Sequence, residues 1–89
     1  MVTLFGRHPV ADYKAWRKVF DEFYPTRKRV GVIREVVYRS ADDPNDITML
    51  FDFATIEEAR AFPNNDELRA AMHMAGSIGA PTIWFAMKA

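Results

Sequence analysis

Alternation of apolar and polar residues predicts four β-strands along the chain, because successive side chains of a strand point to opposite faces. The expected strands cover residues 2–8, 33–40, 47–54 and 82–88. The segment 33–40 interleaves charged with apolar residues, which is typical of an edge strand. The segment 47–54, ITMLFDFA, is almost continuously apolar, which indicates a central strand covered on both faces.

Two further regions carry apolar residues at three- and four-residue spacing, which is the period of an α-helix. The first begins near residues 10–12 and is expected to stop at Gly31, with Pro25 kinking or breaking its last turn. The second region, 55–76, should hold two short helices separated at Pro63.

The resulting order of strand, helix, strand, strand, helix pair and strand is the βαββαβ order of a ferredoxin-like α+β domain. We therefore expect one domain over residues 1–89, with a four-stranded antiparallel sheet and helices on one of its faces. The helices can cover only that face, so the other needs a second molecule. The pattern predicts a homodimer that forms through the open sheet face.

The composition also indicates that part of the apolar surface is covered by a second molecule. Of the 89 residues, 49% are hydrophobic and 13% aromatic, which is richer in large side chains than one small monomer can easily bury. Twelve basic residues balance twelve acidic ones, so no overall field attracts nucleic acid or an anionic membrane. We expect neither as a partner.

The chain contains no cysteine, which excludes disulfides, thiolate nucleophiles and thiolate metal sites. Its two histidines have no spacing typical of metal ligands, so we expect no metal and no cofactor. The first residues lack the pattern of a secretory signal, and no apolar stretch reaches the length of a membrane span. These features together predict a cytoplasmic protein.

Two residues are candidates for proton transfer. His8 lies at the end of the first strand, beside the start of the first helix, and Asp52 interrupts the apolar central strand. A buried carboxylate is costly unless it is paired. The alternative interpretation is that His8 only closes a strand before proline and that Asp52 pairs with Arg34, Arg39 or a backbone amide.

The aromatic residues are candidates for binding a flat hydrophobic ligand, although at helical and strand spacing they also fit an ordinary core. The candidates are Tyr13, Trp16, Phe20, Tyr38 and Trp84. The basic residues of 27–29, with Arg34 and Arg39, could meet a phosphate or carboxylate; a helix terminus and a charged strand edge explain them equally.

Four stretches, in this order, resemble those of a known superfamily: VTLFGRH with DYKAWRKVFDEF, then VVYRSADDPNDITMLFDF, TIEEARAFPNNDELRAAM and TIWFAMK. The whole chain is similar to the dimeric α/β-barrel superfamily that contains the antibiotic-biosynthesis monooxygenase-like proteins. The resemblance implies two sheets packed face to face across a twofold axis, and a ligand cavity between each sheet and its helices. It also implies oxidation of an electron-rich aromatic by dioxygen without metal or flavin.

The haem-degrading branch of that superfamily pairs an asparagine on the first strand with a tryptophan and a histidine around the second helical region. Here the first strand has no asparagine, Phe62 stands near the place of the tryptophan, and Met72 falls where the histidine would be. His73 comes one residue late, a rotation of about 100° on a helix, and is expected to point away from the site. We therefore do not expect haem.

The leading hypothesis is a small-molecule-binding enzyme, a monooxygenase, isomerase or cyclase acting on a hydrophobic aromatic or polyketide-like substrate. Asp52 or His8 would move a proton. The substrate would be held by Tyr13, Trp16, Tyr38, Phe62 and Trp84. The alternative is a non-catalytic dimerisation or ligand-sensing module. An open pocket would favour the enzyme, and a solid core would favour the module.

Overall fold

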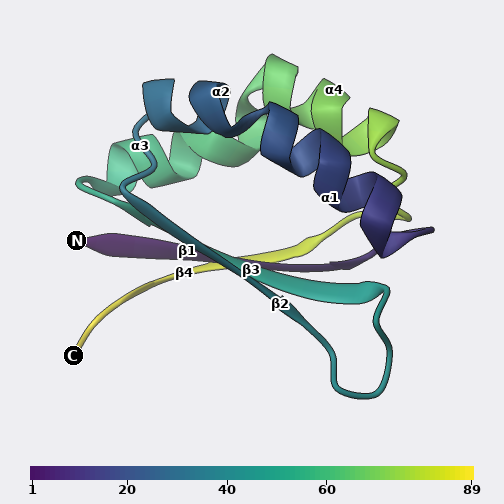
Figure 1. Ribbon diagram of the computed structural model, residues 1–89. Helices are drawn as coiled ribbons and strands as arrows, with labels where there is room; N and C mark the ends of the chain where they lie inside the picture. Colours follow the sequence, from purple (N-terminus) through teal and green to yellow (C-terminus); the bar gives the residue numbers. More distant parts are fainter.

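The computed structural model describes residues 1–89 and has a single sheet with all of its helices on one side (Figure 1). The four strands pair antiparallel throughout, in the order β2-β3-β1-β4. This is the ferredoxin-like arrangement that the sequence predicts. The elements in chain order are β1 (Val2–Pro9), α1 (Tyr13–Glu22), α2 (Tyr24–Arg29), β2 (Arg34–Arg39), β3 (Asp46–Phe53), α3 (Ile56–Ala61), the 3₁₀ turn η1 (Phe62–Asn64), α4 (Asp66–Met74) and β4 (Thr82–Met87).

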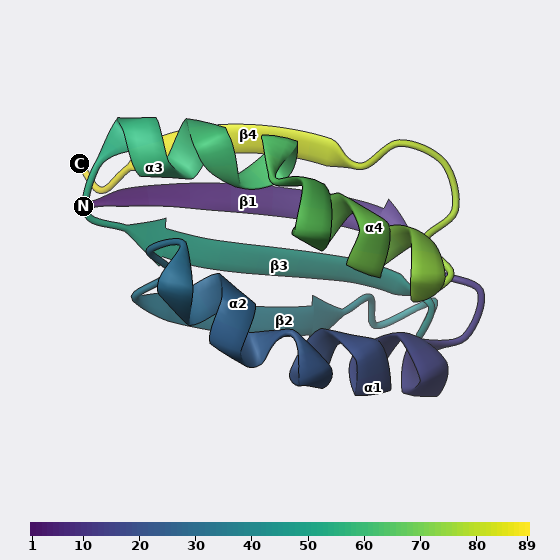
Figure 2. The same cartoon turned by 90° about the horizontal axis from the view of Figure 1, so that it is seen from above.

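The helices form two groups over the sheet (Figure 2). One group, α1 and α2, lies on the side of β2, and the other, α3 to α4, lies over β1 and its neighbours. None of these helices combines the length and the apolar character needed to cross a membrane. The candidate functional site lies between these two groups of helices and the sheet.

Local sequence explains where the helices begin. Three of them start at a residue whose side chain accepts a hydrogen bond from the backbone three positions later: Asp12 before α1, Thr55 before α3 and Asn65 before α4. Pro25 lies in the first turn of α2, where its missing N–H costs nothing. The predicted break is therefore confirmed, as a new helix start.

The expected stop at Gly31 lies two residues beyond the observed helix end at Arg29. Gly31 instead holds the turn into β2 with φ 110°, a conformation that favours glycine. A Cβ at this position would also clash with the carboxylate of Glu58. Because that carboxylate is the end of a flexible side chain, the positive φ is the stronger reason for a glycine in this turn.

The core lies between the inner face of the sheet and the helices. On the central strands the buried inner residues alternate with outer ones, so that Ile47, Met49, Phe51 and Phe53 of β3 face the helices. Leu50 of β3 lies on the other face, paired in register with Phe5 of β1 and Val36 of β2.

No helix covers that outer face (Figure 1). Phe5 stacks on Trp84 there, with ring centroids 5.4 Å apart and ring planes 9° from parallel. Trp84 is 44% exposed and Tyr38 is 55% exposed. The chain therefore presents a partly apolar sheet face to its surroundings.

Candidate functional site

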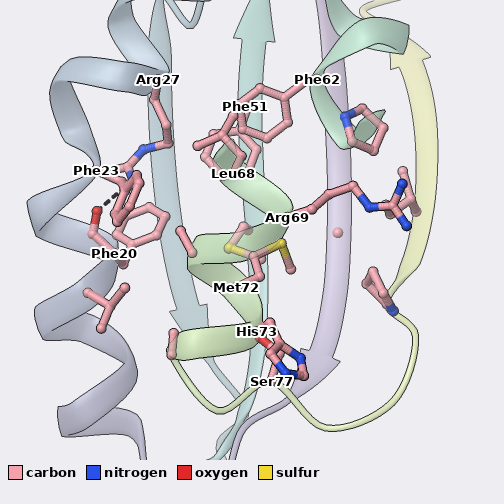
Figure 3. Close-up of a pocket in the computed structure, with 18 of the residues that line it drawn as sticks. Phe20, Phe23, Arg27, Phe51, Phe62, Leu68, Arg69, Met72, His73 and Ser77 are labelled. Atoms are coloured by element: carbon pink, nitrogen blue, oxygen red, sulfur yellow. Dashed lines mark hydrogen bonds between the residues drawn. The ribbon is translucent and has the colours of Figure 1, made fainter. Parts of the chain in front are cut away.

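A cavity of about 420 Å³ lies between the inner face of the sheet and the helices (Figure 3). Its size falls in the range of about 300–1,000 Å³ that is usual for small-molecule sites. The sheet contributes residues such as Leu4, Gly6, Met49 and Phe51, and the opposite wall comes from α1, α2, η1, α4 and the segment after α4. The space between sheet and helices is therefore an open pocket and not a solid core.

A row of aromatic rings forms one wall of the cavity. Trp16 stacks on Phe20 at 4.8 Å, with ring planes 20° apart, and Phe20 lies 6.4 Å from Phe51. Phe51 in turn contacts Phe62 at 4.8 Å. Such a row offers flat, apolar surfaces to a ligand of the same character.

Small residues on the facing surfaces leave room for the cavity. Gly6 lies on the inner face of β1 and has no side chain to fill the space, while Ala71 and Ala75 face it from the region of α4. The nearest atoms to a Cβ built at Gly6 would be Met49 Cε at 3.9 Å and Leu4 Cδ2 at 4.0 Å. A larger residue at position 6 would thus extend into the cavity without a backbone clash.

Arg27 closes the end of the cavity beside α2. Its Nε and Nη2 atoms donate to the carboxylate of Glu35 at 2.8 and 3.0 Å, and its Nη1 donates to the carbonyl of Phe20 at 2.6 Å. The guanidinium also lies over the Phe20 ring, 3.6 Å from its centroid. Arg27 is 3% exposed, and its charge is neutralised by Glu35, so it is a buried cation already paired within the protein.

The basic residues singled out in the sequence do not converge on one anion site. Arg27 pairs with Glu35, Arg34 with Asp52, and Arg39 donates to the carbonyl of Pro44. Arg29 pairs with Glu67 of α4. These contacts support the alternative interpretation of a helix terminus and a charged strand edge.

The polar rim of the cavity comes from α4. Arg69 and His73 are one helical turn apart and both line the cavity, with Met72 beside them (Figure 3). His73 is exposed and lies on the border of this cavity, whereas the expectation that it points away concerned the site of a haem-binding histidine. The cavity runs along the underside of α4, so adjacent helix positions on its border can both reach it.

Two side chains with buried polar atoms, one near the C-terminal end of β1 and one on the segment that follows α4, have no hydrogen-bond partner. His8 is 1% exposed, and neither of its ring nitrogens has a hydrogen-bond partner in the protein. The buried hydroxyl of Ser77 also lacks one. These are the only buried side-chain nitrogen or oxygen atoms in the chain without a partner, although such groups are almost always paired in folded proteins.

Backbone contacts hold the two residues on neighbouring segments. Ser77 forms a bridge with Val10, and the amide of Ile78 donates to the carbonyl of Pro9 at 3.0 Å. Ser77 lines the cavity, and His8 lies against the edge of Trp16, with centroids 6.2 Å apart. Ser77 therefore lines the cavity directly, whereas His8 lies behind the tryptophan of its wall.

The remaining candidates lie elsewhere. Asp52 is on the outer face of the sheet, where its carboxylate accepts hydrogen bonds from Thr3 and from Arg34. Tyr38 and Trp84 are on the same outer face. Tyr13 packs beside Trp16 under the guanidinium of Arg39 without lining the cavity. Of the aromatic residues considered for ligand binding, Trp16, Phe20 and Phe62 line the cavity.

Several cavity residues were not singled out from the sequence. Gly6 carried a usable signal, because a glycine inside a strand pattern often marks a place where space is needed. Arg69 and Ser77 carried none, since a polar residue on a helix surface or in a loop is unremarkable by itself. No group of three acidic or histidine side chains in the structure converges as a metal site.

No family model matches the sequence, and no curated protein matches it significantly. Solved structures do match over almost the whole chain. An antibiotic biosynthesis monooxygenase-like protein of Bordetella bronchiseptica superposes with a TM-score of 0.82 at 14% identity, covering 99% of this chain and 96% of that one. The chain has the fold of the antibiotic biosynthesis monooxygenase-like proteins.

Two other solved structures agree with this fold. SnoaB, a cofactor-independent oxygenase of Streptomyces nogalater, gives a TM-score of 0.76 at 17% identity, covering 99% of this chain and 94% of its own. A similar protein of Nitrosomonas europaea gives 0.75 at 15% identity, with 99% and 98% covered. At these identities the likeness establishes a fold, and the reaction has to be argued from the site.

Burial of His8 generates a prediction about stability and pH. Desolvation lowers the pKa of His8 below that of a histidine in water, and the Asp46 carboxylate opposes this only in part. Below about pH 6.5 the unfolded chain therefore binds a proton that the folded chain resists, and stability is lost as the pH falls towards the folded pKa. Thermal unfolding of the protein should accordingly shift to lower temperature between pH 7.5 and 5.5.

The variant His8→Leu should lose most of this shift, because the buried titrating group is gone. The exposed His73 provides the matched control, and His73→Gln should keep the shift. An unchanged pH dependence in His8→Leu would contradict the prediction.

Proposed function

We propose that the protein binds a flat hydrophobic aromatic or polyketide-like molecule in its sheet–helix cavity and acts on it as a cofactor-independent monooxygenase. The observation that carries the proposal is the cavity itself, lined by the stacked rings of Trp16 and Phe20 and by Phe51 and Phe62. The fold shared with SnoaB, a cofactor-independent oxygenase, supports it. An open cavity also favours an enzyme over a purely structural module.

The proposed reaction needs no reductant other than the substrate. The substrate loses a proton next to a hydroxyl or carbonyl group, and the resulting electron-rich anion reduces dioxygen. One oxygen atom replaces two hydrogens of a ring methylene as a carbonyl, and the other leaves with those hydrogens as water. Isomerisation and cyclisation, the related possibilities, begin with the same loss of a proton. The protein must therefore supply a proton acceptor beside an apolar binding site.

For the proton acceptor we propose His8, which is buried against Trp16 of the cavity wall. Burial lowers the pKa of His8, which keeps the imidazole neutral and able to accept a proton at physiological pH. Both ring nitrogens are unpaired, so no protein group competes for the proton. Asp52 has Thr3 and Arg34 as partners on the outer face, and for it we propose a role in the interface described below.

Thermal unfolding against a panel of hydroxylated polycyclic aromatics, small unsaturated lactones and haemin tests the binding function. A ligand at a hundredfold its dissociation constant should stabilise the protein by about 2.7 kcal/mol, a shift of roughly ten degrees or more for a domain of this size. Gly6→Val should abolish the shift by filling the cavity, since valine suits a strand and its Cβ has room at this position.

Thr82→Val is the matched control, because it adds the same side chain to a strand outside the cavity. It should leave the shift intact. Ligands that stabilise Gly6→Val as well as the parent protein would show that the cavity is not their site.

Turnover distinguishes the two candidate proton acceptors. With a ligand from the panel and oxygen uptake as the readout, His8→Gln should lower the rate by about 10²–10⁴-fold, the usual contribution of a general base. Asp52→Asn should leave the rate nearly unchanged. The rate of the parent protein should stay on its plateau below the ordinary histidine pKa of about 6.5. The opposite ranking of the two variants would assign the role to Asp52.

We also propose that two copies pack through their outer sheet faces. Support comes from the exposed aromatic surface, where Phe5 stacks on Trp84 and Leu50 lies between its neighbours on β1 and β2. Burying such side chains is the main favourable term in stable association. Asp52 and Arg34 form a paired charge on the same face, which can be buried at lower cost than a lone charge.

Trp84→Glu should convert the dimer into a monomer, because it places an unpaired charge in the proposed contact. Light scattering should then report a mass near 10.2 kDa instead of twice that value. Ile78→Glu changes an apolar residue outside this face that is at least as exposed as Trp84, and it should remain dimeric. A parent protein that is monomeric at all accessible concentrations would rule out the interface.

A further inference from the structure

The rim of the cavity carries a cation that no protein group binds. The side chain of Arg69 makes no hydrogen bond, no ion pair and no contact with an aromatic ring. Every other arginine has such a partner. Arg39 donates to a carbonyl, and Arg60 lies over the Phe85 ring. The remaining five pair with an acidic side chain: Arg7, Arg17, Arg27, Arg29 and Arg34. Arg69 lies at the mouth of the cavity and extends from α4 towards the side of β4 (Figure 3).

Arg69 forms no ion pair with any acidic side chain. The cavity lining contains no aspartate or glutamate. Of the two acids at the start of α4, Glu67 is paired with Arg29, and Asp66 forms no ion pair. The other cation of the cavity, Arg27, is already neutralised by Glu35. Arg69 is exposed, so its guanidinium is free to bind an anion at the border of the cavity.

We propose that the molecule bound in the cavity is an acid, a planar aromatic whose carboxylate or phenolate oxygen is held by Arg69 while its rings lie along Trp16 and Phe20. This inference rests on the proposed binding function and names the chemical class of the ligand. A guanidinium matches a carboxylate in shape and donates two parallel hydrogen bonds to it. Next to an apolar cavity the pair is screened less by water than one on an open surface.

His73 strengthens the same assignment. It follows Arg69 by one helical turn and lines the same rim, so its ring can donate a further hydrogen bond to an anion held there. Arg69 and His73 then present two hydrogen-bond donors beside a site whose walls are aromatic. A neutral hydrocarbon of the same shape would use the walls and leave these donors without a partner.

A matched pair of probes distinguishes the contribution of the ligand's charge to binding from that of its rings. Naphthalene-2-carboxylate and naphthalene-2-carboxamide have nearly the same shape and differ in charge. Chemical-shift titration of the isotope-labelled protein gives the dissociation constant of each probe and shows which residues it contacts. We expect the carboxylate to bind about tenfold more tightly, the effect of a charge-assisted hydrogen bond at a partly exposed site, and the preference should shrink as salt is added.

Three variants test whether Arg69 causes the preference for the carboxylate. Arg69→Met removes the donors but keeps an unbranched helix-forming side chain, and it should abolish the preference without changing the affinity for the carboxamide. Arg69→Lys should restore part of the preference. Arg60→Met, the matched control, removes an arginine outside the cavity and should leave the preference intact.

The outcomes separate this inference from the function on which it rests. Equal binding of the two probes to the parent protein, or a preference that survives Arg69→Met, would overturn the assignment of an acid while leaving an aromatic ligand in place. Failure of both probes to shift any cavity residue would count against the aromatic-binding function and against the acid together.

Discussion

The buried pair between Arg27 and Glu35 is the interaction on which the layout of the helical layer depends. A guanidinium can be buried only if nearly all of its donors are satisfied. Here Glu35 of the edge strand, the carbonyl of Phe20 and the Phe20 ring satisfy it together. The requirement fixes the junction of α1 and α2 over β2, and it places Phe20 against the cavity. The same pairing leaves this end of the cavity electrically neutral, so any charge recognition must come from the opposite rim.

The cavity is a consequence of how large and small residues are distributed between the two layers. Trp16, Phe20 and Phe62 fill the space near α1 and η1 with stacked rings. On the other side, Gly6 and the alanines of the α4 region contribute almost no volume. Close packing would require bulky residues at both places, because protein interiors tolerate few voids. The small residues thus keep the cavity open, and the core loses some packing contacts. Burial of the outer sheet face in a dimer would offset that loss of stability.

Much of this architecture could be predicted because it depends on periodicity alone. The strands, the split helices and the open sheet face follow from alternation, helical spacing and proline positions. Which face a side chain occupies is harder. In the central strand both alternating sets are largely apolar, so Leu50 and Phe51 gave no sign of which set faces the helices. The placement of Asp52, Tyr38 and Trp84 therefore needed the structure. Charge gave no better guide, because Arg27 is buried and Arg69 is free although both are arginines on helices.

The position of His8 shows how the alternation of side chains along β1 separates the two functions proposed for the sheet, ligand binding on one face and dimerisation on the other. Even positions of β1 face the helices, and odd positions such as Thr3 and Phe5 face outward. His8 shares the parity of Leu4 and Gly6, so the buried imidazole belongs to the cavity side, whereas Asp52, opposite Thr3, belongs to the outer side. A shift of one residue in register would exchange these roles. Because β1 pairs with both β3 and β4, it is doubly fixed against such a shift. Pairing on both of its sides thus keeps the residues of the binding site and those of the open face on opposite faces of β1.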